Sequence, residues 1–481
     1  MKNFERCVFH LDLRVQVIRF PKLLELIELL SRKGFNALII EWEASFPYDK
    51  HTTISNRYAY TREQIAELVE FAAIHSMEII PLQQCFGHVE YILRHDRYAH
   101  LREDEDKLGQ VCPCKNEEAL AVFREMMEDM IRLHPSPYFH IGGDETRLLG
   151  RCPECAQVVK DKGLSYLYAK YLKEILDLVK SLGKIPLLWA DIILKYPEYA
   201  SILPKEAVFI DWNYGWAFDK FGDNRQLLDQ GFTFWGAPAI RSDPDNYWLT
   251  CWNKHLENYE AFIPYAKKNG YRGIILTSWS TSGEYGYFRD AENHVADILP
   301  WRRVYPQAGF NLLIEGFISA VSSKQAFDPG TFLNHYASNQ FGLSSSQAME
   351  FTRIFRRKRQ HLARQAVVES AALGSRDDFH LMNEFPVEKN RSEWDHLLLM
   401  AHMEAHQLEF MLLEDKFENE SFQLSGKSEL KEALALLSKE ADAIDVEFRR
   451  LNGEYLDPHE LQVEIEYRRY RLDDLIAKIN R

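Results

Sequence analysis

The sequence predicts an α/β protein, namely a (β/α)₈ TIM barrel with a C-terminal α-helical domain. Short apolar runs alternate with amphipathic stretches up to about residue 325, and beyond that point the strand-like runs stop. A chain of 481 residues is long enough for one such barrel and an appendage. We therefore place the barrel at residues 1–325 and a helical bundle at residues 326–481.

Eight short apolar runs are the candidate barrel strands. They cover residues 7–13, 36–42, 78–83, 138–141, 185–190, 207–212, 232–235 and 273–278. Amphipathic helices are expected between them, for example at residues 21–33, 61–75, 117–133 and 165–182, with a final helix near 306–322. Thr61 and Gln64 have the spacing of a capping box at the start of the second helix. An open, doubly wound sheet is the alternative, because one miscounted strand would change the topology.

The C-terminal part of the chain is dominated by long, charged amphipathic segments. These segments cover residues 347–365, 394–413, 430–450 and 458–479. They predict a helical bundle that packs against the barrel or against a neighbouring subunit, so that a homodimer is one of the expected assemblies.

Composition and charge exclude several classes of protein. The chain has 58 basic and 72 acidic residues, and a net charge of −14 argues against a nucleic-acid partner. No apolar run approaches the roughly 18 residues of a membrane span, and the first residues lack the apolar region of a signal peptide. The same charge balance favours a partner that is neutral or small. The odd count of seven cysteines indicates reduced thiols and a cytoplasmic protein.

The C-terminal ends of the strands are where a barrel of this type carries its functional side chains. Several candidate strands end in polar or aromatic residues, notably His140-Ile-Gly-Gly-Asp144-Glu145 after the fourth strand and His88 after the third. Tryptophans also fall at strand ends: Trp42, Trp189, Trp212, Trp235 and Trp279. Aromatic rings beside carboxylates are what a pyranose sugar needs, although rim tryptophans can also be ordinary packing residues.

The Gly-Gly-Asp-Glu segment has two interpretations. The glycines let the backbone turn or approach a ligand closely, and the two carboxylates point in different directions, so that one can act as an acid. Alternatively, Asp144 and Glu145 open the next helix as capping residues. Because His88, Arg14 and the tryptophans also fall at the ends of candidate strands, the functional interpretation is favoured.

His140-Ile-Gly-Gly-Asp144-Glu145 resembles the signature of glycoside hydrolase family 20, the β-N-acetylhexosaminidases. Segments 10–13, 40–48 and 86–90 are similar to the hexosaminidase D-like branch in particular. Agreement is dense over residues 8–150 and thinner to about residue 300. The resemblance implies an exo-acting, retaining enzyme for terminal β-linked GlcNAc or GalNAc, in which the substrate's own 2-acetamido group is the nucleophile.

The resemblance also implies roles for individual residues. Glu145 matches the general acid/base, Asp144 matches the residue that orients the acetamido group, and His88 matches the histidine that pairs with the catalytic glutamate. Such an acid would need a raised pKa to stay protonated near neutrality. Arg14 matches the arginine that binds ring hydroxyls, and a carboxylate from the second strand, Glu41 or Glu43, would complete the relay to His88.

The resemblance places Trp189, Trp212 and Trp279 around the acetamido group. Two departures from the family pattern concern the same pocket. Many members carry Trp-x-Glu on the eighth strand, whereas this chain has Trp279-Ser-Thr281 with Glu284 and Tyr285 beyond. The tyrosine that holds the acetamido carbonyl has no clear counterpart, and Tyr214 and Tyr247 are the alternatives.

Four cysteines form a second constellation, Cys112-Pro-Cys114 and Cys152-Pro-Glu-Cys155. Four thiols could hold a structural zinc ion, but free thiols are favoured, because Cys-x-Cys is a less common ligand spacing. No catalytic metal site and no cofactor are expected. The main alternative to an enzyme is a non-catalytic carbohydrate-binding or sensing barrel, which would not need an acid/base carboxylate.

Overall fold

The computed structural model describes residues 4–242, 245, 249–280, 304–359, 369–419 and 426–481. The chain divides into two compact units. Of the described residues, the first unit holds those up to Ala239 and Ala261–Trp279. The second unit holds Ile240–Glu260 and the residues from 304 onward. The predicted boundary near residue 325 stays a prediction.

The first unit is a closed barrel of eight parallel strands. In order around the barrel these are β1 (Arg6–Asp12), β2 (Ala37–Glu41), β3 (Glu78–Leu82), β6 (Tyr138–His140), β7 (Ile185–Trp189), β8 (Val208–Trp212), β9 (Thr233–Ala237) and β11 (Gly273–Ser278). The register Val8↔Ile275 and Val8↔Ala37 pairs β1 with β11 on one side and β2 on the other, which closes the sheet. The prediction of a (β/α)₈ barrel is confirmed, and the open-sheet alternative is wrong.

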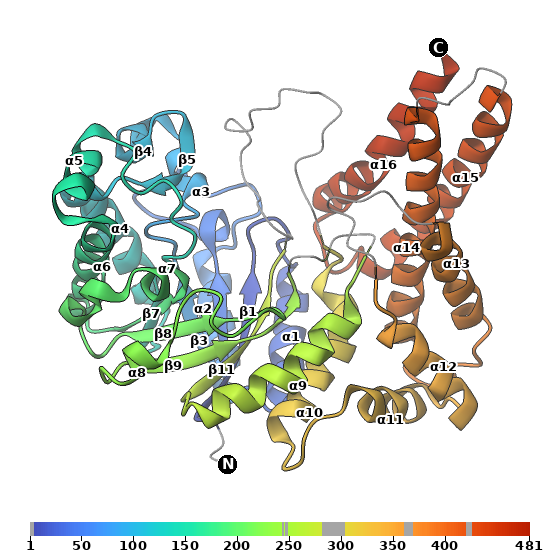
Figure 1. Cartoon of the computed structure of the whole chain (residues 1–481), viewed down its shortest axis with the longest axis horizontal. Coiled ribbons are helices and arrows are strands. Elements are labelled where there is room, and N and C mark those ends of the chain that lie inside the picture. The colour runs from blue at the N-terminus through green and yellow to red at the C-terminus, as the bar shows by residue number, and fades with distance from the viewer. Residues whose placement is uncertain (1–3, 243–244, 246–248, 281–303, 360–368, 420–425) are drawn as a thin grey trace. The chain divides into compact units, whose positions relative to one another are not determined.

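Helices connect successive strands and lie outside them (Figure 1). The connections contain α1 (Phe20–Lys33), α2 (Arg62–Ile74), α4 (Asn116–Leu133), α5 (Pro153–Lys162), α6 (Leu164–Ser181), α7 (Asp191–Lys195), α8 (Arg225–Leu228) and α9 (Trp252–Lys268). The predicted capping box is confirmed, because Thr61 accepts the backbone N–H of Gln64 and the Gln64 side chain accepts that of Thr61. Helix α10 (Asn311–Ser322) follows the last strand in sequence.

Between β3 and β6 the chain forms structure that the alternation pattern did not predict. It includes α3 (Glu90–Leu93) and a two-stranded antiparallel sheet of β4 (Arg102–Asp104) and β5 (Lys107–Val111). A short strand, β10 (Ala239–Arg241), also follows β9 and lies next to β11 in the sheet. Strand β4 reads Arg-Glu-Asp and β5 reads Lys-Leu-Gly-Gln-Val, so neither is the apolar run that identified the barrel strands.

Alternate side chains of the strands fill the barrel interior. Val8, Ile39, Ile80, Leu187 and Ile210 belong to one buried cluster. Above this apolar layer, at the C-terminal ends, the interior becomes polar, with His10, Glu41 and His140 fully buried. The change from apolar to polar layers marks the C-terminal end as the place for a site.

The second unit is helical, as predicted. After α10 come α11 (Pro329–Phe341), α12 (Ser345–Arg356), α13 (Glu369–Asn383), α14 (Arg391–Glu418), α15 (Lys427–Asn452) and α16 (Pro458–Asn480). Phe410 of α14, Leu434 of α15 and Leu475 of α16 belong to one hydrophobic cluster, which identifies a helix bundle. No helix of the described residues is long and apolar enough to span a bilayer.

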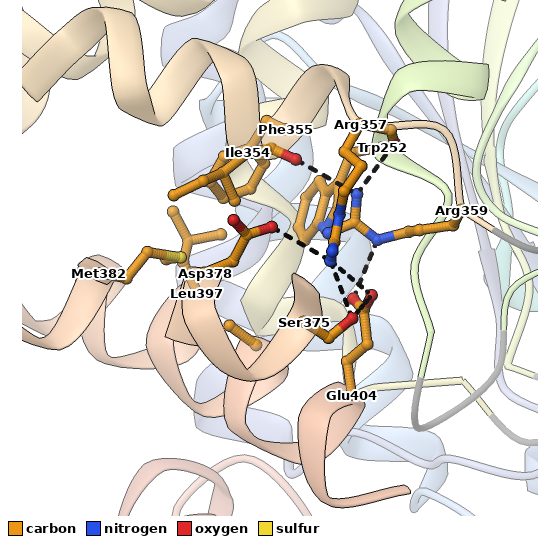
Figure 2. A pocket seen from close by; sticks show the side chains of 11 residues that line it. Trp252, Ile354, Phe355, Arg357, Arg359, Ser375, Asp378, Met382, Leu397 and Glu404 are labelled. Atoms are coloured by element: carbon orange, nitrogen blue, oxygen red, sulfur yellow. Dashed lines mark hydrogen bonds and ion pairs between the residues drawn. The ribbon is translucent and has the colours of Figure 1, made fainter. Parts of the chain in front are cut away.

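A small pocket in the second unit is lined by charged side chains that bind one another (Figure 2). Arg357 Nη2 lies 3.1 Å from Asp378 Oδ2 and 3.3 Å from Glu404 Oε1, and it donates to Ser375 Oγ at 2.9 Å. Arg359 Nε donates to Glu404 Oε2 at 2.9 Å. Each of the two carboxylates has an arginine partner, so this cluster joins the end of α12 to α13 and α14.

Candidate functional site

The last residues of the barrel strands and the loops that follow them carry the candidate catalytic and substrate-binding residues that the structure describes. Arg14 follows β1, Glu43 follows β2, His88 follows β3, and Asp144 and Glu145 follow β6. Trp189 and Trp212 are the last residues of β7 and β8, and Trp279 follows β11. Three further candidates, Tyr247, Glu284 and Tyr285, lie outside the described residues.

His88, Asp144 and Glu145 form one cluster. His88 Nε2 lies 3.3 Å from Asp144 Oδ2 and 3.4 Å from Glu145 Oε2. Asp144 is buried, and its Oδ1 atom has no hydrogen-bond partner. A buried carboxylate oxygen without a donor costs free energy, so this atom is suited to accept a hydrogen bond from a ligand.

The local backbone explains the Gly-Gly pair before Asp144. Gly142 has φ +67° and Gly143 has φ +88°, which is the left-handed region that glycine adopts at low cost. A methyl group on Gly142 would collide with the Gln84 side chain, and one on Gly87 would collide with the Asp144 carbonyl oxygen. The β3 and β6 loops therefore approach each other closely only because these positions lack a Cβ atom.

Three candidate residues themselves have positive φ: Glu43 at 43°, His88 at 52° and Glu145 at 47°. Apart from glycine, only Ser76 and Asn390 share this conformation among the described residues. Left-handed φ values in side chains with a Cβ atom are uncommon and cluster at functional sites. This observation identifies the strand ends as a site independently of the motif.

The charges of the cluster are strongly coupled. Burial disfavours the charged His88 ring, but Asp144 and Glu145 outweigh this and raise the pKa of His88 well above its usual value. Burial also disfavours an ionised Glu145, but His88 and Arg147 together lower the pKa of Glu145 to about 2. The expectation of a raised pKa for Glu145 is therefore wrong for the ligand-free structure, in which the proton resides on His88.

Asp191, the first residue of α7, was not among the sequence candidates. Its Oδ2 accepts the backbone N–H of Glu145 at 3.1 Å, and its Oδ1 is buried without a hydrogen-bond partner. Burial and then the charge of Asp144 raise the pKa of Asp191 to about 7. The signal was present in Trp189-Ala-Asp191 at the end of β7, but an acidic residue at the start of a helix is typical of a capping residue.

A second polar network connects the first three strands. Glu41 Oε2 bonds to His10 Nε2 at 3.1 Å, and Glu41 Oε1 accepts from Gln84 at 2.9 Å. Arg14 donates to Asp12 at 3.0 Å and lies 4.0 Å from Glu43. Glu41 is thus bound to His10 and Gln84. A link from a second-strand carboxylate to His88 stays a prediction, with Glu43 as the better candidate.

Aromatic side chains from β7, β8 and β11 meet at the same end of the barrel. The rings of Trp189 and Trp279 are 5.7 Å apart, those of Trp212 and Tyr214 are 5.2 Å apart, and the Arg14 guanidinium lies over Trp279 at 5.0 Å. Trp279 Nε1 donates to the Tyr214 hydroxyl at 2.8 Å. The Tyr214 oxygen therefore accepts this bond.

Trp42 and Trp235 do not belong to this group, and for both the packing alternative holds. Trp42 is fully buried and packs against Phe46, Tyr60 and His134. Strand β9 continues two residues beyond Trp235, whose ring lies in the barrel interior beside Tyr138 at the start of β6.

Comparison with known proteins agrees with this geometry. The model of the glycosyl hydrolase family 20 catalytic domain matches residues 14–297. The chain belongs to glycosyl hydrolase family 20. It is therefore a glycoside hydrolase with a small carbohydrate substrate, which confirms the family that the Gly-Gly-Asp-Glu motif indicated.

Among the family's named members, Hexosaminidase D of Bos taurus is 30% identical over 366 residues, covering 72% of this chain and 99% of the bovine protein. Hexosaminidase D of Homo sapiens is 30% identical over 305 residues, covering 59% of this chain and 61% of the human protein. Among solved structures, the chitobiase of Flavobacterium johnsoniae has a TM-score of 0.53 at 14% identity, covering 99% of this chain and 72% of that one. At this identity, the likeness supports the fold.

Proposed function

We propose that this family 20 glycoside hydrolase is an exo-acting, retaining β-N-acetylhexosaminidase. It removes terminal β-linked GlcNAc or GalNAc, and the substrate's 2-acetamido oxygen attacks C1 in place of an enzyme nucleophile. The observation that carries this proposal is the Asp144–Glu145 pair around one His88, with Asp144 Oδ1 buried and lacking a donor. The relatives named hexosaminidase support the substrate class.

Glu145 is the general acid and then the general base. In the free protein His88 holds the proton and Glu145 is ionised. A bound sugar displaces water from the site and lowers the local dielectric constant. The free energy needed to keep His88 protonated and Glu145 ionised therefore rises. The proton then moves from His88 Nε2 across the 3.4 Å contact to Glu145 Oε2, which leaves a neutral pair with the acid loaded. Glu145 passes this proton to the glycosidic oxygen as the bond to C1 breaks.

Asp144 stabilises the acetamido group as it reacts. Attack of the carbonyl oxygen on C1 forms an oxazolinium ion and places positive charge near the acetamido nitrogen. The Oδ1 atom of Asp144 can accept that N–H, and the bond strengthens as the charge develops. Retaining enzymes of this kind are exceptions to the scheme of two catalytic carboxylates.

The remaining candidates bind the sugar. Trp189, Trp212 and Trp279 form apolar walls for the pyranose and the acetamido methyl group, while Arg14 and Glu43 bind ring hydroxyls. Tyr214 holds the acetamido carbonyl: since Trp279 donates to its oxygen, the Tyr214 O–H hydrogen can point to the ligand. The hydrolysis requires no cofactor, because the nucleophile comes from the substrate and the acid from Glu145.

The decisive experiment compares p-nitrophenyl β-GlcNAc, β-GalNAc and the plain β-glucoside. We expect hydrolysis of one or both N-acetylhexosaminides and very little of the glucoside, together with tight inhibition by a thiazoline mimic of the intermediate. Asp144→Asn keeps the size of the side chain but removes its charge, and is expected to lower kcat on the order of 10²–10³-fold with less effect on KM.

Equal rates on glucoside and N-acetylglucosaminide, or a covalent adduct trapped on a carboxylate, would overturn the proposed nucleophile. A carbohydrate-binding barrel without turnover is the alternative, and it is not favoured because binding alone needs neither Glu145 nor its proton donor. Binding of GlcNAc with no hydrolysis of any of the three substrates would favour it.

We further propose a reducing compartment, the cytoplasm, because all seven cysteines are free thiols. The helical bundle is the surface through which a homodimer would form, and light scattering on the purified chain tests this. Neither nucleic acid nor a membrane is among the proposed partners, given the net charge of −14.

A further inference from the structure

Four of the seven cysteines converge in the first unit, away from the strand ends that carry Glu145. Cys112 follows β5, Cys114 lies in the single turn Pro113–Lys115, and Cys152 and Cys155 lie at the start of α5. Cys112 Sγ is 3.4 Å from Cys152 Sγ and 3.6 Å from Cys155 Sγ, and Cys155 Sγ is 3.3 Å from Cys114 Sγ. The pairs are about 40 residues apart in sequence, so the fold brings them together.

These separations fit a metal better than disulfides. A disulfide requires about 2.05 Å between sulfurs, and all four thiols are free. A tetrahedral zinc ion with Zn–S bonds of about 2.3 Å places its sulfurs about 3.8 Å apart. Three of the six separations lie within about half an ångström of that value. Cys114 Sγ lies close to Cys155 but outside the group of ligand atoms that are all within 4.8 Å of one another, so the Cys114 side chain has to turn toward the other sulfurs to complete the tetrahedron.

The surroundings also suit a bound cation. Cys112 and Cys155 are fully buried, and Leu167, Leu149 and Val159 pack around the sulfurs. The Cys155 backbone N–H donates to Cys152 Sγ at 3.2 Å at the start of α5, an interaction that stabilises a thiolate. Uncompensated thiolates would be costly in such apolar surroundings, and a divalent cation offsets that cost.

A buried carboxylate lies beside the sulfurs. Glu103 of β4 is 2% exposed, and its Oε1 accepts the backbone N–H groups of Arg151 and Cys152 at 2.7 and 3.1 Å. The Glu103 carboxylate also accepts a hydrogen bond from the Cys112 thiol. This carboxylate and the sulfurs of Cys112, Cys152 and Cys155 lie within 4.8 Å of one another.

We propose that Cys112, Cys114, Cys152 and Cys155 bind one structural zinc ion as four thiolates, with Glu103 as a positioning residue that holds the Arg151–Cys152 turn. Binding releases the thiol protons to solvent and changes no oxidation state. The site leaves no open position, so it joins the β5 end to the start of α5 and takes no part in hydrolysis. Sequence spacing alone favoured free thiols, and the convergence of the sulfurs reverses that preference.

The site also has a consequence for the loop after β6. Gln110 of β5 accepts the backbone N–H of Leu148 at 2.8 Å and pairs with Gly87, next to His88. The metal therefore fixes both chain segments that flank the His88–Glu145 contact. An effect of zinc removal on activity rests on the proposed function, whereas zinc binding itself does not.

The test uses the full chain, expressed with zinc and purified without a chelator. We expect one zinc ion per chain by elemental mass spectrometry, and release of that zinc when a mercurial reagent titrates the thiols. Replacement by cobalt should give the intense visible and thiolate charge-transfer absorption of a tetrahedral tetrathiolate site. Removing zinc should lower Tm, because the metal binds the folded state.

Cys112→Ser and Cys152→Ser are expected to lose the metal, whereas Cys251→Ser, a half-buried thiol outside the cluster, keeps it. Glu103→Gln should keep the zinc stoichiometry but bind it more weakly. A zinc-free wild-type protein, a chain mass that shows two disulfides, or the absorption of bound iron would overturn the proposal. These readouts on the wild type hold even if a serine variant fails to fold.

Discussion

Two buried charged clusters in this chain are built in different ways. In the helical unit, Arg357 and Arg359 pair with Asp378 and Glu404, so each of these carboxylates has an arginine partner. At the barrel strand ends, three neighbouring carboxylates, those of Asp144, Glu145 and Asp191, have only His88 and the exposed Arg147 as ion-pair partners among the described residues, and Asp191 contacts neither.

We infer that the helical cluster contributes to the stability of the fold, whereas the barrel cluster serves ligand binding and catalysis. A balanced cluster loses free energy of unfolding when one member is removed, because the remaining charge is left unpaired. An unbalanced cluster holds groups that a ligand can satisfy, at a cost to the free protein. We therefore expect substitutions in the barrel cluster to change turnover, and substitutions in the helical cluster to change stability.

The largest expected effect is at the acid. Glu145→Gln removes proton donation and should lower turnover of a natural disaccharide about 10²–10⁴-fold, with a smaller loss on a p-nitrophenyl substrate whose leaving group needs no proton. The substitution also removes the ion pairs of Glu145 with His88 and Arg147, so a fall in melting temperature should accompany the loss of turnover. Steady-state kinetics on both substrates, with the exposed Glu117→Gln as control, test this. Near-wild-type turnover of the disaccharide would remove Glu145 from the acid role.

The matched substitution in the helical unit is Glu404→Gln. It removes the carboxylate that both Arg357 and Arg359 bind, so that Arg357 keeps only Asp378, and should lower the free energy of unfolding by about 3–5 kcal/mol, while kcat/KM is unchanged. Urea unfolding together with kinetics measures both quantities. Glu418→Gln, at the exposed end of α14, is the control. A loss of activity without a loss of stability would show that the comparison is mistaken.

The pH dependence of stability should reveal the His88 pair. Because the folded pKa of His88 is raised, its stabilising effect is full below the unfolded pKa of about 6.5 and is lost as pH rises through the folded value. Because the folded pKa of Glu145 is lowered to about 2, its effect is present above about 4.5 and is lost as pH falls toward 2. The stability difference between wild type and His88→Gln should therefore be greatest at mildly acidic pH. A difference that grows steadily toward alkaline pH would contradict this assignment.

The smallest effect is expected at Arg147, whose side chain is 58% exposed and lies 2.8 Å from Glu145 Oε1. Arg147→Ala removes a cation beside the His88–Glu145 pair, which holds one proton, so the pair should keep that proton to higher pH and the alkaline limb of the kcat/KM profile should move the same way. An exposed ion pair contributes at most about 1 kcal/mol, so the shift should stay below about 0.7 of a pH unit. A larger shift would mean that substrate binding buries this pair.

The sequence by itself determined the barrel, the helical bundle and the strand ends that carry Arg14, His88, Asp144 and Glu145. These features depend on local patterns: apolar runs of strand length, helical periodicity and a motif whose glycines the turn requires. For Trp42 and Trp235 the sequence left pocket and packing roles open, because a tryptophan near a strand end looks the same in sequence whether it faces a pocket or the core.

The tertiary structure alone decided which charges meet. In the folded chain Glu41 bonds to His10 and Gln84, and Asp191 accepts the Glu145 backbone N–H. The charged neighbours that the fold assembles raise the pKa of His88 and lower that of Glu145, which favours the proton on His88. It also brought Cys112 within 3.4 Å of Cys152. Contacts of this kind join residues tens of positions apart, and pKa values depend on burial and on neighbouring charges, so neither is encoded in any short stretch of sequence.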